Sequence, residues 1–237
     1  MSGRRYQRWD RSQIRQHQLL VSSVLLLGLT GVPQRYADTK PAQVVASMLG
    51  GAQTMVALHR VGGIMLLICM LWHASYLLRR WRQGTFRPST LPRVKDITDA
   101  WHLVLYLFGL KPTEPNYDRY SFLEKFDYWA ATGGSCLMIS TGFVLWFKDM
   151  AHRLLGAQAY DVAFHLHSLE SVLALVFLLV GHVYHVHLAG GIKPFNMVWL
   201  TGQMSRHEMA EHHPAELERL DAAGRGGDTG DGPISTR

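Results

Sequence analysis

The chain has 237 residues, of which 18% are charged, and a formal net charge of +6. Its mean hydropathy lies close to zero, which is too apolar for an ordinary soluble domain, so the apolar residues must be clustered in segments. A basic protein raises the question of nucleic-acid binding, but the positions of the basic residues are better explained by membrane orientation, and no nucleic-acid partner is expected.

Four apolar stretches are long enough to cross a bilayer, for which a helix needs about 20 mostly apolar residues. The predicted spans are Gln18 to Tyr36, Val56 to Leu78, Tyr128 to Phe147 and Phe164 to Leu188. A basic segment precedes the first span, as in a secretory signal, but no small-residue cleavage site follows it, so we expect a retained helix. The two cysteines, Cys69 and Cys136, fall inside spans, where a thiol behaves as a small apolar side chain.

The basic residues predict the orientation of the spans, because short basic loops stay on the cytoplasmic side. They concentrate in the N-terminal segment and in the connection between the second and third spans. That connection holds Arg79, Arg80, Arg82, Arg87, Arg93, Lys95, Lys111, Arg119 and Lys125. The other two connections hold two basic residues each, Arg35 with Lys40 and Lys148 with Arg153. Both termini are therefore expected in the cytoplasm.

The connection between the second and third spans has a helical pattern of its own. From Leu91 to Leu110, apolar residues recur at helical spacing opposite Lys95 and Asp99, which predicts an amphipathic helix on the cytoplasmic surface. The proline-rich run KPTEPNYDRYS should be irregular. The predicted fold is thus an all-α bundle of four transmembrane helices, N-in and C-in. Its parts are a basic N-terminus (1–16), a membrane domain (17–205) and a cytoplasmic tail (206–237), disordered beyond about Ala222.

Histidines stand at matched depths in two of the spans, and ionisable groups inside a bilayer are usually functional. His59 and His73 are 14 residues apart, about 21 Å and nearly four helical turns, so both rings point roughly one way. His167 and His182 have nearly the same reach on the fourth span. Pairs placed in this way can hold two stacked haems, each iron bound by one imidazole from each of two facing helices.

Simpler interpretations apply to single residues in this set. An isolated interfacial histidine usually snorkels to the headgroups. His165 lies about 200° around the helix from His167, so the two cannot bind the same iron. The glycines of the spans, among them Gly28, Gly31 and Gly181, either let a porphyrin approach the backbone or simply pack the helices together.

Several runs of sequence together resemble a known family. They include the LTG of the first span, ALHRVGGI around His59, YSFLEKFDYW, STGFVLWF, FHLHSLE, GHVYHVHL, GIKPFNMVWLTGQMS and EHHPAELERL. With these the chain resembles the cytochrome b (gamma) subunits of membrane-bound formate dehydrogenases and their relatives serving Ni-Fe hydrogenases and thiosulfate reductases. The likeness extends to about Ala223.

The resemblance implies two b haems in a multi-pass protein of the bacterial inner membrane. His59 and His167 would bind the haem nearer the outside, and His17 and His182 the one nearer the cytoplasm. Helical spacing instead places His73 opposite His182. Together with His187, His73 is surplus to the implied pattern, so either His73 replaces His17 or the surplus histidines bind a third haem.

The resemblance also implies a quinone site near the inner haem. Its candidate residues are Tyr120, Ser121 and Glu124, just before and at the start of the third span. Ser121 stands where the formate dehydrogenase branch has an asparagine. The alternative for Glu124 is an ordinary interfacial ion pair with the basic residues around it.

The function implied is electron transfer between the quinone pool and an iron–sulfur or cytochrome subunit on the periplasmic side. Oxidation of a substrate would belong to a separate catalytic subunit, so no catalytic residues are expected here. One alternative is a self-contained reductase of the cytochrome b561 type that uses His59, His73, His167 and His182. Another is a haem-free anchor or a zinc or copper transporter, although the acidic residues expected at mid-depth are lacking apart from Glu170.

Overall fold

A computed structural model describes residues 5–188 and 196–223. The tail expected to be disordered lies, from residue 224, outside the described residues. The chain forms two compact units. The span unit comprises Arg15–Phe86 and Trp129–Asn196, and the sheet unit comprises the described parts of Met1–Ile14, Arg87–Tyr128 and Met197–Arg237.

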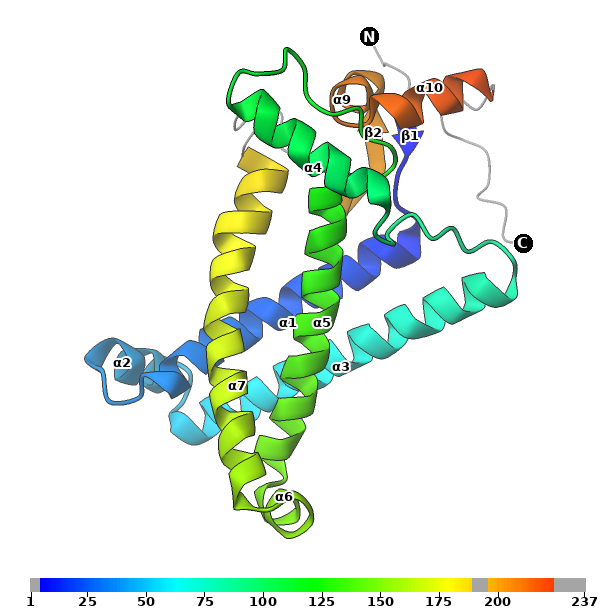
Figure 1. The fold of residues 1–237 in the computed structure, drawn as a ribbon. Coiled ribbons are helices and arrows are strands. Elements are labelled where there is room, and N and C mark those ends of the chain that lie inside the picture. The colour runs from blue at the N-terminus through cyan, green and yellow to red at the C-terminus, as the bar shows by residue number, and fades with distance from the viewer. Residues whose placement is uncertain (1–4, 189–195, 224–237) are drawn as a thin grey trace. The chain divides into compact units, whose positions relative to one another are not determined.

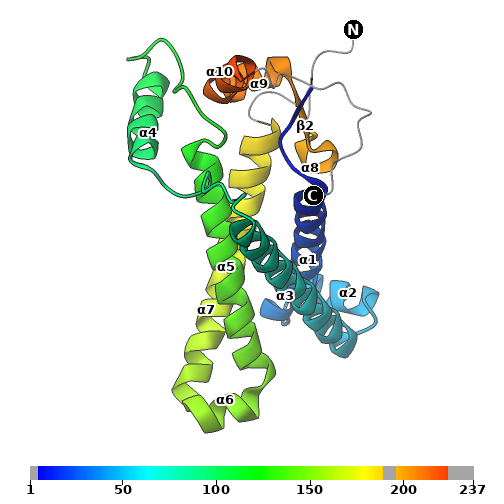
Figure 2. The same cartoon turned by 90° about the vertical axis from the view of Figure 1, so that its right-hand side faces the viewer.

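Helices make up the span unit. Two of them, α1 and α5, have their first residues in the sheet unit and the rest in the span unit. The helices are α1 (Arg11–Arg35), α2 (Lys40–Met48), α3 (Ala52–Arg82), α5 (Phe122–Trp146), α6 (Lys148–Leu155), α7 (Ala157–Val176) and the π-helix η1 (Phe177–Leu188). α5 and α7 lie side by side in both views (Figures 1 and 2). The predicted helical fold is thus confirmed, apart from two strands of three residues each.

Two of the described helices, α3 and α7 continued by η1, are long and apolar enough to cross a membrane. α5 and α6 form a third crossing if this pair, bent by 98°, counts as one span. α1 does not pass the same test, since it carries polar residues such as Gln18 and Gln34. The count of four spans and their orientation therefore stay predictions.

Large apolar side chains are exposed along these helices, among them Leu25 of α1, Ile68 of α3 and Leu179 of η1. A soluble protein rarely leaves so much contiguous apolar surface in contact with water. Exposure of these side chains to the hydrocarbon of a bilayer carries no hydrophobic cost, because lipid tails are equally apolar. The exposed surface therefore agrees with a membrane environment.

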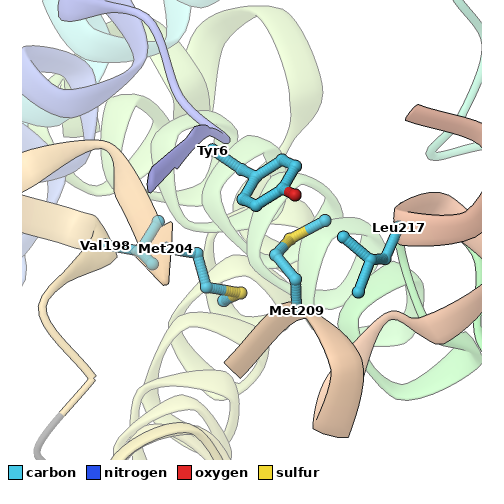
Figure 3. Packing of buried hydrophobic residues seen from close by; sticks show 5 residues of the cluster. All are labelled: Tyr6, Val198, Met204, Met209 and Leu217. Carbon is cyan, nitrogen blue, oxygen red and sulfur yellow. The ribbon is translucent and has the colours of Figure 1, made fainter. Parts of the chain in front are cut away.

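A two-stranded antiparallel sheet holds the sheet unit together. β1 (Arg5–Gln7) pairs with β2 (Gln203–Ser205), with Tyr6 opposite Met204. The unit also contains α4 (Val94–Leu107), α8 (Val198–Thr201), α9 (Arg206–His212) and α10 (Pro214–Ala222), of which α9 packs against both strands. Tyr6, Val198, Met204, Met209 and Leu217 form its core (Figure 3).

The amphipathic helix expected between the second and third spans is present as α4. Ile97, Trp101 and Leu107 are exposed on it, while Lys95 pairs with Asp99 one turn on, at 2.5 Å. This apolar exposed surface suits a helix lying in a membrane interface, although its location stays a prediction. As expected, the described proline-rich connection after α4 contains no regular element.

Candidate haem-ligand sites

Two pairs of histidine rings meet inside the span unit. His59 of α3 and His167 of α7 have ring centroids 6.3 Å apart at an interplanar angle of 71°. His17 of α1 and His182 of η1 have centroids 6.4 Å apart at 43°. We call these the outer and the inner pair, after the positions that the resemblance implies. Neither pair is stacked face to face.

The separation of each pair suits two ligands of one metal ion. Imidazole nitrogens bind metals at about 2 Å, and the ring centre lies about 1 Å behind the binding nitrogen, so two axial imidazoles have centres about 6 Å apart. Both pairs are half-buried between helices, whereas His165 is exposed. The residues present therefore fit a bis-histidine haem at each pair, and the partners are those that the resemblance implies. The ligand roles themselves stay a prediction.

The π-helical geometry of η1 bears on the position of His182. An interval of 15 residues from His167 would leave an angular offset of about 60° in a regular α-helix. The hydrogen bonds of a π-helix close wider turns, so each residue between Phe177 and His182 rotates the chain by less than in an α-helix. The extra residue in the interval is thereby absorbed, and His182 returns toward the face of the helix that carries His167.

The surplus histidines have different neighbours. His73 lies beside Gln16, with its Nδ1 at 2.8 Å from the amide Oε1, and its ring is 6.4 Å from that of Tyr76. The ring of His187 lies 6.4 Å from that of His182, because the hydrogen bonds of a π-helix link residues five apart on neighbouring turns. The ring contact between His17 and His182 favours His17 over His73 as the partner of His182.

Two threonines that the sequence analysis did not single out contact the outer pair. Thr30 Oγ1 of α1 lies 2.9 Å from Nδ1 of His59, and Thr141 Oγ1 of α5 lies 2.9 Å from Nδ1 of His167. The signal was present in the sequence as the Thr-Gly dipeptide shared by the LTG and STGFVLWF runs.

The quinone-site candidates lie in the sheet unit, at the start of α5. Ser121 and Glu124 form a capping box: the Ser121 N–H donates to Glu124 Oε2 at 2.8 Å, and the Glu124 N–H donates to Ser121 Oγ at 3.2 Å. The ring of Tyr120 has the guanidinium groups of Arg8 and Arg119 at 5.5 and 5.6 Å from its centroid. All three residues thus have structural partners, and their role toward quinone stays a prediction.

Next to Tyr120 is a buried group of charges. Glu216 of α10 accepts hydrogen bonds from both Arg8 and Arg119, the latter at 2.9 Å. His213 donates from Nδ1 to the carbonyl oxygen of Asp118 at 2.9 Å, and its Nε2 lies 3.2 Å from the guanidinium of Arg8. Burial, followed by the charge of Arg8, lowers the pKa of His213 from its ordinary value, so the imidazole stays neutral.

A bare metal ion would need more ligands than either histidine pair supplies. Among the described side chains of residues 5–188 and 196–223, which do not include that of His185, no group of three or more histidine, cysteine or acidic residues is placed to hold one. Haem iron needs only two axial ligands from the protein, since the porphyrin supplies its other nitrogens. Two imidazoles at each pair are therefore sufficient as protein ligands for haem iron.

Comparison with known proteins identifies a family for most of the chain. Residues 8–197 match the family described as prokaryotic cytochrome b561, in keeping with the resemblance to cytochrome b subunits of Ni-Fe hydrogenase-type complexes. No curated protein sequence matches the chain. Because the family match covers well over half of the sequence, the chain belongs to the prokaryotic cytochrome b561 family of haem-b-binding membrane proteins that transfer electrons.

Proposed function

We propose that the protein holds two b haems, one at each histidine pair, and serves as the membrane electron-transfer subunit of a larger oxidoreductase complex. The observation that carries the proposal is the equal spacing of the two pairs, with ring centroids at 6.3 and 6.4 Å. Bound haem would supply the one-electron chemistry.

The protein's own contribution is to bind and orient the haems and to keep water away from them. His59 and His167 come from α3 and α7, and His17 comes from α1, so each site joins two helices of the span unit. The exposed apolar side chains of these helices face hydrocarbon, which keeps water from the sites between them. The half-buried imidazoles thus lie in a setting of low dielectric constant.

The family match and the resemblance are the basis for the partners that we infer. Oxidation of a substrate would belong to a separate catalytic subunit, as the resemblance implies. We infer a redox partner on the periplasmic side, a quinone as the membrane-soluble partner, and residence in the bacterial inner membrane. The family match supports this general role.

Haem content per polypeptide tests the proposal. The measurement is a pyridine haemochrome assay together with a reduced-minus-oxidised spectrum of the purified protein and of His17→Ala, His59→Ala, His167→Ala and His182→Ala. We expect two haems in the unaltered protein and the loss of one in each variant. His165→Ala is the matched control, since His165 is exposed two residues from His167, and should keep both.

His73→Ala distinguishes the two pairings of the inner site. We expect it to keep both haems, because the ring that lies 6.4 Å from that of His182 belongs to His17. One haem lost with His73→Ala and none with His17→Ala would favour the pairing by helical spacing. Three haems in the unaltered protein would give the surplus histidines a site of their own. Absence of haem would favour the alternative function of a haem-free membrane anchor or metal transporter.

The quinone site at Tyr120, Ser121 and Glu124 needs a test of its own, because Ser121 and Glu124 also form the capping box of α5. Ser121→Asn is the informative variant, since asparagine also caps helices well. If the site is here, the variant keeps its fold and haem content while the apparent affinity for a quinol analogue changes. An unchanged affinity would move the site elsewhere.

A further inference from the structure

The two histidines of the outer pair are held by the same dipeptide on two different helices. Thr30 and Gly31 of α1 contact His59, and Thr141 and Gly142 of α5 contact His167. In both cases the threonine Oγ1 lies 2.9 Å from Nδ1 of the ring. The glycine that follows lies against the Cε1 edge of the same ring.

The direction of each hydrogen bond follows from the threonine's other partner. Thr30 Oγ1 donates to the carbonyl oxygen of Leu26 at 2.6 Å, and Thr141 Oγ1 donates to that of Leu137 at 2.7 Å. A hydroxyl has one hydrogen, and here the carbonyl four residues earlier takes it. Toward the imidazole the threonine oxygen can therefore only accept.

This assignment determines the tautomer of both rings. A neutral imidazole carries one hydrogen, which must be on Nδ1 in order to be donated to the threonine. The Nε2 atoms of His59 and His167 are then left with the lone pair, which is the form that binds a metal ion. The Thr-Gly pairs thus prepare both rings for ligation before any iron is bound.

The glycines provide the space for this contact. A Cβ at Gly31 would lie 3.0 Å from Cε1 of His59, closer than carbon atoms normally approach. A Cβ at Gly142 would lie 3.4 Å from Cε1 of His167, which is close to ordinary van der Waals contact. The two positions should therefore differ in their tolerance of alanine.

We propose that Thr30-Gly31 and Thr141-Gly142 are matched positioning elements that fix the tautomer of the outer pair and lower the midpoint potential of the haem held there. A hydrogen bond accepted from Nδ1–H makes an imidazole a stronger electron donor, and the chain from carbonyl to hydroxyl to ring reinforces it. A stronger donor stabilises ferric over ferrous iron. The inference rests on the proposed function, since it presupposes haem at this pair.

The test replaces each hydroxyl by a methyl group of similar size. Thr30→Val, Thr141→Val and the double variant are compared by potentiometric titration that resolves the two haems, and by the low-spin signals in electron paramagnetic resonance. We expect one haem to shift to a higher midpoint potential in each single variant and further in the double variant, while the other haem stays unmoved. The affinity for that haem should fall by about tenfold to a hundredfold.

Rescue and controls separate this role from a purely structural one. Thr30→Ser and Thr141→Ser keep the oxygen and should return the potential to that of the unaltered protein. Ser140→Ala removes a hydroxyl that is bonded to a helix carbonyl but exposed, and should change nothing. Gly31→Ala should perturb the spectrum of the same haem more than Gly142→Ala does.

The outcomes keep this inference apart from the proposed function. Two haems with unchanged potentials in both valine variants would overturn the inference and leave the proposed function intact. A shift that serine does not reverse would also overturn it. Absence of haem from the unaltered protein would overturn the proposed function itself, and the inference with it.

Discussion

Replacing Glu216 by alanine should open the sheet unit, because two guanidinium groups depend on this one carboxylate. Glu216 is 3% exposed and Arg8, its nearer partner, is 4% exposed. Arg119 bonds the second carboxylate oxygen at 2.9 Å. Without Glu216, Arg8 keeps a carbonyl oxygen, the neutral ring of His213 and the face of Tyr120 among the described groups, so a buried positive charge loses its counter-charge.

The expected effect is large for a single side chain. Breaking a buried ion pair by removing one partner costs about 3–5 kcal/mol, since the remaining charge stays desolvated. At about 1.4 kcal/mol per factor of ten, the open fraction of the unit rises by about a hundredfold to a few thousandfold. Arg219→Ala is the matched control, because Arg219 is 54% exposed and its surface pairs contribute only about 0–1 kcal/mol.

Thiol labelling measures this opening directly. Met209 is 0% exposed in the core of the unit, so a cysteine there reacts with a maleimide only when the unit opens. The native Cys69 and Cys136 are first replaced by alanine, and Met209→Cys is common to all samples, so its own effect cancels. Equal labelling rates for Glu216→Ala and Arg219→Ala would refute the argument from buried charge.

The same assay checks three further expectations. Gly202→Ala should raise the labelling rate strongly, because residue 202 has a positive φ of 71° and a Cβ there would lie 2.5 Å from a backbone carbonyl oxygen. The unit should lose stability as the pH falls below about 6.5. Burial and the charge of Arg8 lower the pKa of His213 in the folded unit, so the unfolded chain takes up a proton at a higher pH than the folded one does. His213→Gln should remove most of this pH dependence. Asp96→Ala should destabilise the start of α5, since it leaves the buried ammonium of Lys125 without the carboxylate at 2.7 Å, whereas Asp96→Glu should restore much of the loss.

Periodicity and hydropathy were sufficient to find most of the long helices and the histidines on them. Apolar length alone predicted α3 and the helix from α7 through η1, and amphipathic spacing predicted α4. α1 shows where hydropathy alone is a poor guide to a packed helix. Residues such as Ser23 and Thr30 lower its mean hydropathy, but their side chains are buried and bonded to backbone carbonyl oxygens, so they are compatible with packing against other helices.

The pairing of the histidines could not be read from helical spacing. A helical wheel gives the face on which His59, His73 or His182 lies, but it contains nothing about which helix stands opposite that face. It also assumes a regular α-helix, whereas the π-helical turns before His182 change the rotation per residue. The resemblance supplied the partners that the spacing argument could not.

What the sequence determined by itself was the class of protein: long apolar helices, basic connections and histidines within apolar segments are local properties that need no partner to be recognised. Tertiary structure alone decided which side chains meet. Thr30 and His59, or β1 and β2, lie far apart along the chain and come together only when helices and strands pack. Hydrogen bonds and ring contacts act over a few ångströms, and a linear pattern does not contain those distances.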